Sequence, residues 1–272
     1  MRIQHNIAAM NSYRNLTNNN SALSKNLEKL SSGYRINRAG DDAAGLAISE
    51  KMRAQITGLE AAQKNANDAI SLVQTAEGAL TEVHSMLNRM VELSIQSANG
   101  TYADAVDREN LQAEVTELLS EIDRIANTTN FNGIKLLNGN YSGTLQIGDT
   151  AEALNQLSVP ISATTVDGLG INGLDISTQV LASGAVQTIK DAINIVSTIR
   201  GKLGATQNRL EHTINNLSVQ TENITAAESR IRDVDMADEM MAYTKNNILV
   251  QASQAMLAQA NMVPQGVLQL LQ

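Results

Sequence analysis

Apolar residues recur at spacings of three, four and seven near both ends of the chain. The N-terminal series is Ile3, Ile7, Met10, Leu16, Leu23, Leu27 and Leu30, and the C-terminal series is Met241, Ile248, Ala255 and Met262, followed by Val267 and Leu271. Such spacing gathers apolar side chains on one face of a helix. We expect the first helix to end at Gly33, because glycine readily adopts the left-handed conformation of a helix end. We expect Pro264 to end the last helix, because proline lacks an amide hydrogen.

Three further helices are predicted inside these ends. The first covers about residues 43–99 and carries Leu59, Val73, Leu80 and Leu87, and a shorter one covers about 104–126. The third shows the most regular repeat in the chain, with Ile189, Val196, Leu203, Leu210, Leu217, Ile224 and Ile231 all seven residues apart. A sustained seven-residue repeat is typical of helices that pack along their whole length. We therefore expect the 189–231 helix to pack against the 43–99 helix as the core of a rod.

Residues 128–183 differ from the flanking segments in composition and in the spacing of their apolar residues. Asn-Gly pairs occur at 132–133 and 138–139, and short alternating runs such as 144–147 follow them. Asn-Gly favours tight hairpin turns. We therefore expect small hairpins and loops in this segment.

These patterns predict a mainly α fold: a long antiparallel coiled coil or helical bundle built from both chain termini, with a small β-hairpin-rich middle. The expected domains are a terminal helical coiled-coil domain, residues 1–44 with 232–272, and a rod-like helical bundle, residues 45–231. The β- and loop-rich segment 128–183 lies within the second domain.

Composition narrows the class of protein. The chain of 272 residues has one Phe, five Tyr, no Trp and no Cys, so a compact aromatic core and disulfides are excluded. A net charge of −8 opposes nucleic-acid binding, which requires Lys and Arg to neutralise phosphates. The sequence contains no apolar run long enough for a membrane span or a cleaved signal peptide, so we expect no membrane insertion.

No enzyme site is expected. His5, His84 and His212 are isolated, without a second ligand three or four residues away, so neither a metal nor a cofactor is predicted. The carboxylates at 41–42 and at 121 and 123 suggest helix capping, and ion pairs with Arg35 or Arg124, more than paired catalytic acids.

Several longer segments resemble one protein family. They are IQHNIAA at 3–9, LSSGYRIN at 30–37, DDAAG at 41–45, QSAN at 96–99, QAE at 112–114, EIDR at 121–124, TNFNG at 129–133 and LAQAN at 257–261. In this order and at these separations they resemble bacterial flagellin, over roughly residues 1–150 and 185–272. The short middle resembles a minimal form without large outer domains.

The resemblance implies a secreted structural subunit that polymerises into the extracellular flagellar filament for swimming motility, without enzymatic activity. The implied partners are further copies of the chain, the filament cap and hook-junction proteins, and an export chaperone on the last helix. It also implies recognition of the monomer by a Toll-like innate immune receptor, through Arg89, Leu93 and Glu114. A shared helical face is expected for Arg89 and Leu93, which lie one turn apart.

Two alternatives remain open. A hook-filament junction protein shares the terminal repeats, although residues 96–133 resemble flagellin proper. A flagellin carrying an inserted enzyme is the second alternative, although the middle segment is short for an enzyme domain.

Overall fold

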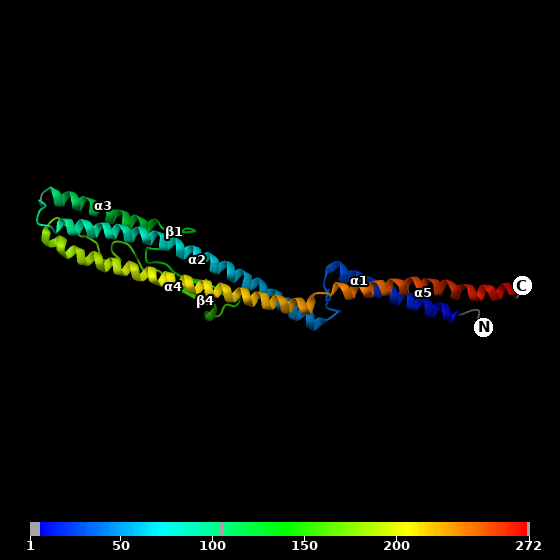
Figure 1. Cartoon of the computed structure of the whole chain (residues 1–272). Helices are drawn as coiled ribbons and strands as arrows, with labels where there is room; N and C mark the ends of the chain where they lie inside the picture. The colour runs from blue at the N-terminus through cyan, green and yellow to red at the C-terminus, as the bar shows by residue number, and fades with distance from the viewer. Residues whose placement is uncertain (1–5, 104–105, 271–272) are drawn as a thin grey trace. The chain divides into compact units, whose positions relative to one another are not determined.

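The computed structural model describes residues 6–103 and 106–270, and describes side chains as far as residue 263. The predicted positions Ile3 and Leu271, and the side chain of Val267, lie outside this described part. The elements are α1 (Ile7–Ser32), α2 (Ala43–Ser97), α3 (Asp107–Thr128), β1 (Asn130–Phe131), β2 (Ile134–Lys135), β3 (Ser142–Gln146), the 3-10 turn η1 (Ala153–Asn155), β4 (Gln156–Pro160), α4 (Gln179–Arg232) and α5 (Met236–Leu270) (Figure 1). The mainly α fold with a small β-rich middle is confirmed.

The chain forms two compact units, which are described separately. One unit comprises residues 57–221, and the other comprises residues 1–56 together with 222–272. These boundaries differ from those expected at 44 and 232, because the start of α2 and the end of α4 contact each other in the terminal unit. There Arg232 donates to Glu50 at 2.7 Å, and Ser49 donates to Glu228 at 3.4 Å.

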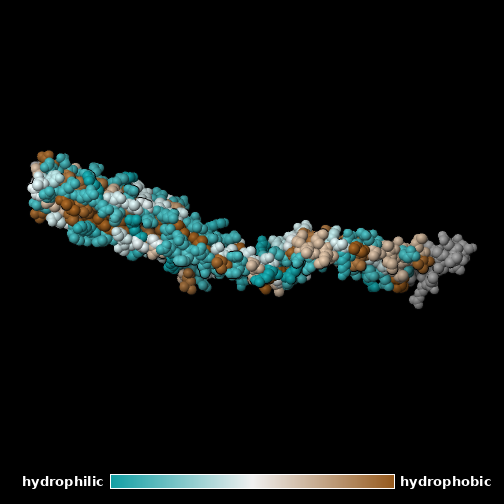
Figure 2. Space-filling model, viewed as in Figure 1, coloured by the Kyte–Doolittle hydropathy of each residue, from teal (hydrophilic) through white to brown (hydrophobic). Residues whose placement is uncertain are grey.

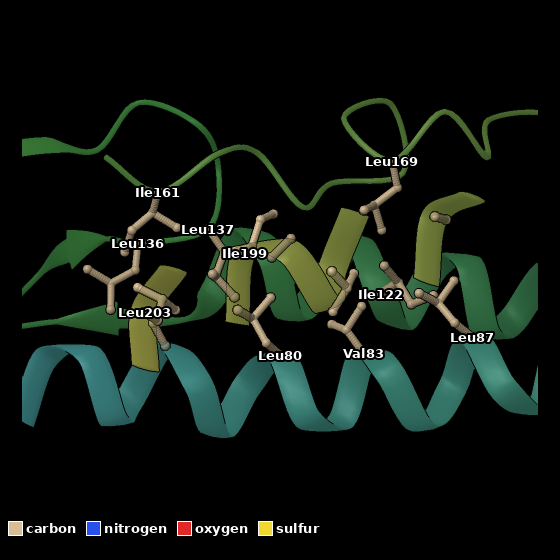
Figure 3. Close-up of a cluster of buried hydrophobic side chains, with 14 of the residues drawn as sticks. Leu80, Val83, Leu87, Ile122, Leu136, Leu137, Ile161, Leu169, Ile199 and Leu203 are labelled. Carbon is tan, nitrogen blue, oxygen red and sulfur yellow. The ribbon is translucent and has the colours of Figure 1, made fainter. Parts of the chain in front are cut away.

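The first unit is a bundle of α2, α3 and α4 around a continuous apolar core. The predicted positions on α2 and α4 are at most 5% exposed: Leu59, Val73, Leu80, Leu87, Ile189, Val196, Leu203, Leu210 and Leu217. Ile224 and Ile231, which belong to the terminal unit, are half-buried. Leu80, Val83 and Leu87 of α2 lie close to Ile122 of α3 and Ile199 of α4 (Figure 3). Small aliphatic contacts repeated along these helices replace a compact aromatic core.

The β-rich middle covers part of this bundle. Strand β1 pairs with β2, and β3 pairs with β4 in the register Thr144 to Ser158, both antiparallel. Asn132 and Gly133 both have positive φ, 51° and 80°, as a tight Asn-Gly turn requires. Leu136, Leu137 and Ile161 join the bundle core (Figure 3). The middle segment therefore completes the bundle and is not a separate domain.

Two polar residues of α3 that sequence reasoning missed hold neighbouring segments: Arg108 holds the end of α2, and Gln112 holds the segment before α4. Arg108 is 4% exposed, and its guanidinium donates to the carbonyls of Ser97 and Asn99 at 2.7 and 2.8 Å. Gln112 accepts from the amide of Ile176 at 2.7 Å and donates to the carbonyl of Leu174 at 3.1 Å. A cation is favourable here because the last carbonyls of a helix carry partial negative charge.

In the terminal unit, a connector of residues 33–42 joins α1 to α2. Gly33 ends α1 with φ 74°, as predicted. Asp42 caps α2 by accepting from the amide of Gly45 at 2.9 Å. Asp41 instead accepts from the amides of Asn37 and Arg38 at 3.2 and 3.1 Å. Arg35 pairs with neither aspartate and donates to the carbonyl of Ile231, whereas the predicted Arg124–Glu121 ion pair is present.

The prediction that Pro264 ends the last helix is wrong, because α5 continues to Leu270. Proline at 264 removes the helical hydrogen bond to the carbonyl of Ala260. That carbonyl accepts instead from the Asn6 side-chain amide at 2.8 Å. A hydrogen bond from the opposite end of the chain thus compensates for the one that proline removes.

Candidate assembly surface

The two terminal helices, α1 and α5, pack against each other in antiparallel orientation. Seven buried or half-buried positions of α1 follow a three-four spacing: Ala9, Ser12, Leu16, Asn19, Leu23, Asn26 and Leu30. On α5 the corresponding series is Glu239, Tyr243, Asn246, Val250, Ser253, Leu257 and Ala260. We call the contact between these two series the terminal seam. About half of its positions are polar or small, so the seam buries little apolar surface.

The apolar residues predicted on α5 lie away from the terminal seam. Met241, Ile248 and Met262 are 65%, 60% and 62% exposed, and Ala255 is also exposed. Position 248 lies two residues from both 246 and 250, which on a helix is about 200° of rotation. These four residues therefore form a stripe on the face opposite the seam, which we call the α5 stripe.

Helix α1 divides in the same way. Leu16, Leu23 and Leu30 enter the terminal seam, whereas Ile7, Met10 and Leu27 are 59%, 64% and 49% exposed. Apolar residues are visible at the surface along this helix pair (Figure 2). Monomeric proteins rarely expose long apolar patches unless they mark a contact surface.

The connector beside the terminal helices is fixed by charge and hydrogen bonding. The amides of Arg38 and Asn37 hold the pKa of the Asp41 carboxyl below its usual value. The Arg232 guanidinium lies 4.7 Å from the centre of the Tyr34 ring, and Lys29 of α1 pairs with Glu239 of α5 at 3.7 Å. These polar contacts, together with the buried side chain of Ile36, hold the base of the terminal helices.

A second surface lies on the bundle. Arg89 of α2 donates to Glu114 of α3 at 2.8 Å, and the two side chains are 46% and 43% exposed. The hydrogen bond with Glu114, and a second one with Glu92, raise the pKa of the Arg89 guanidinium. The structure thus brings together two of the three predicted receptor residues, which lie on different helices.

The third predicted receptor residue, Leu93, does not share this face. It is 0% exposed and belongs to the bundle core. A residue four positions along a helix is rotated by about 40°, and here that rotation turns Leu93 inward. Arg89 and Leu93 therefore do not present the shared face that was expected from their spacing, because only Arg89 is exposed.

Neither a metal site nor a membrane span is found in the described part of the chain. Residues 6–103 and 106–270 contain no group of three or more His, Cys, Asp or Glu side chains that could hold a metal ion. No helix within the same residues is long and apolar enough to cross a bilayer.

The chain combines long packed helices with apolar stripes that stay exposed on the terminal helix pair. These two features are typical of helical structural subunits, which bury their remaining apolar surface when they assemble. Comparison with known proteins specifies the family. Residues 3–142 match the bacterial flagellin N-terminal helical region, and residues 186–271 match the bacterial flagellin C-terminal helical region.

Relatives match over the whole chain. The flagellin of Bacillus subtilis (strain 168) is 56% identical, with 100% of both chains covered. The flagellar filament 33 kDa core protein of Treponema phagedenis is 48% identical, also with 100% of both chains covered. The crystal structure of Bacillus cereus flagellin is 31% identical, with a TM-score of 0.50, and the match covers 61% of this chain and 94% of that one. The chain belongs to the bacterial flagellins, and it is a structural subunit of the extracellular flagellar filament.

Proposed function

We propose that α1 and α5 are the polymerisation element of this flagellin, and that the α5 stripe is buried by neighbouring copies of the chain. The observation that carries the proposal is the exposure of Met241, Ile248 and Met262, each 60% or more, on a helix that is already packed on its other face. Burying one such side chain contributes about 1.5–3 kcal/mol. Repeated in every subunit, this gain favours addition to a filament.

The proposal is tested by changing the α5 stripe without changing the seam. We expect the triple variant Met241→Gln, Ile248→Gln and Met262→Gln to remain folded and fail to form filaments, as judged by sedimentation and electron microscopy. Gln254→Ser with Asn261→Ser, at exposed polar positions beside the stripe, is the matched control and should polymerise normally. Normal filaments from the triple variant would reject the proposal.

The same exposed surface supports proposals for the other partners. An export chaperone that covers the α5 stripe would keep it from associating before secretion. The filament cap and the hook-junction proteins would contact the same terminal helices at the two ends of the filament. We further propose that the chain has no catalytic activity, which a zymogram of the purified protein would contradict by showing a cleared band.

We also propose, as a second function, that the monomer is recognised by a Toll-like innate immune receptor through Arg89 and Glu114. Their exposed ion pair across α2 and α3 supports this, because it presents a polar contact on a rigid surface. Leu93 would act only by holding α2 in the core. We expect Arg89→Ala and Glu114→Ala each to lower potency in a receptor reporter assay while circular dichroism stays unchanged. Arg124→Ala, which breaks another exposed ion pair on α3, is the control. Full potency in both Arg89→Ala and Glu114→Ala would reject this function.

A further inference from the structure

Each helix of the terminal pair contributes two heptad positions to the seam, and one of the two is polar or small. On α1 the apolar position is Leu16, Leu23 and Leu30, and the polar position is Ser12, Asn19 and Asn26. On α5 the apolar position is Tyr243, Val250 and Leu257, and the polar or small position is Asn246, Ser253 and Ala260. Polar residues thus recur every seven residues through the seam.

The polar positions meet each other across the seam. The Asn19 side-chain amide donates to the Ser253 hydroxyl at 3.0 Å and lies 3.5 Å from the carbonyl of Leu249. Because the helices are antiparallel, counting seven residues along each from this contact brings Asn26 level with Asn246. Asn26 is 8% exposed, and its Nδ2 atom has no hydrogen-bond partner among the described residues. A leucine there would cost less free energy to bury.

A polar layer that lowers stability can still select one arrangement of two helices. A shift of three or four residues would place Asn19 against Val250 or Leu257 and leave its amide buried without a partner. With leucine at every seam position, such shifts would exchange one apolar contact for another. Polar residues inside coiled coils specify register in this way, at a cost in stability.

We propose that Asn19, Asn26, Asn246 and Ser253 fix the register of α1 against α5. They are specificity-determining residues for assembly, because the register decides where the exposed stripes of the two helices lie relative to each other. The proposal rests on the pairing of α1 with α5 within a chain and not on what covers the α5 stripe. Its failure is therefore distinguishable from failure of the proposed polymerisation element.

The register can be measured as a distance between two spin labels. The chain has no cysteine, so Ser24→Cys and Asn261→Cys, at exposed positions of α1 and α5, provide two unique attachment sites. Because Asn19 lies level with Ser253, Ser24 lies level with residue 248, so the two sites are about 20 Å apart along the helix axes and their distance changes when the register shifts. Labelled chains are diluted into an excess of unlabelled chains before assembly, so that each measured distance lies within one subunit. A shift of three or four residues moves the helices by about 5 Å along their axis.

Two multiple variants are compared in this labelled chain. The first is Asn19→Leu, Asn26→Leu, Asn246→Leu and Ser253→Leu, which makes the seam apolar throughout. The second is Asn19→Ser with Ser253→Asn, which exchanges the two partners and keeps the layer polar. We expect one narrow distance for the original seam and for the exchange variant. For the leucine variant we expect two or more distances, or one displaced by about 5 Å.

A single unchanged distance in the leucine variant would overturn the proposal, as would several distances in the exchange variant. If the leucine variant does not enter filaments, the same distance is measured in the free chain, where its apolar seam favours pairing. In the free chain, too, a single unchanged distance in the leucine variant or several distances in the exchange variant would overturn the proposal.

Discussion

The bundle of α2, α3 and α4 and the terminal pair of α1 and α5 are both built on seven-residue repeats, but they bury different parts of them. In α4 the apolar repeat at Ile189, Val196 and Leu210 is 0% exposed. In α5 the apolar repeat at Met241, Ile248 and Met262 is at least 60% exposed, and the buried face is instead the seam, in which about half of the positions are polar or small. A seven-residue apolar repeat therefore predicts a helical face that packs against another surface, but it does not tell whether that surface belongs to the same chain.

The largest difference between the two regions is expected in the stability of the single chain. Leu87→Ala should lower the free energy of unfolding by about 2–5 kcal/mol, because it leaves a cavity in a fully buried core. Ile248→Ala should change it by less than about 0.5 kcal/mol, because the side chain is exposed before assembly. Urea denaturation of unassembled chains measures both values. Equal losses in the two variants would contradict the comparison.

The smallest expected effect concerns the connector of the terminal unit, where the Asp41 carboxylate accepts hydrogen bonds from two backbone amides. The folded pKa of Asp41 is lowered, so its contribution to stability is present above the unfolded pKa of about 3.9 and is lost as pH falls through the folded value. We expect the amide NMR signals of Asn37 and Arg38 to titrate together with a midpoint below 3.8. In Asp41→Asn this titration should be absent. A midpoint above 3.8 would show that the two amides do not hold the carboxylate.

Much of the fold follows from local patterns in the sequence. The Ile189 to Leu217 repeat predicts the α4 core, Gly33 predicts the end of α1, and Asn132-Gly133 predicts a hairpin turn, since each depends on nearby residues. The continuation of α5 beyond Pro264 could not be predicted, because it depends on Asn6, more than two hundred residues away. The burial of Arg108 could not be predicted either, although its partners are near in sequence, because it depends on how α3 packs back against the end of α2.

The candidate site could be predicted only in part. The α5 stripe is visible as an apolar repeat, but the repeat by itself does not tell whether the same chain buries it. The repeat of Ser12, Asn19 and Asn26 was present in the sequence as well, but an apolar search overlooks polar heptads. The burial of Leu93 did not follow from its spacing to Arg89, because a spacing of four gives approximate proximity on a helix, whereas burial depends on the 40° that remain.

The central claim is that the terminal helices gain their burial from neighbouring subunits. The most direct test removes residues from Ile248 onward and follows assembly by sedimentation. The lost apolar contacts contribute on the order of 5 kcal/mol or more to each addition step, so only monomer should form. The α4 core remains, so helical content and a cooperative melt of the bundle should persist. Filaments of normal diameter from the truncated chain would contradict the account.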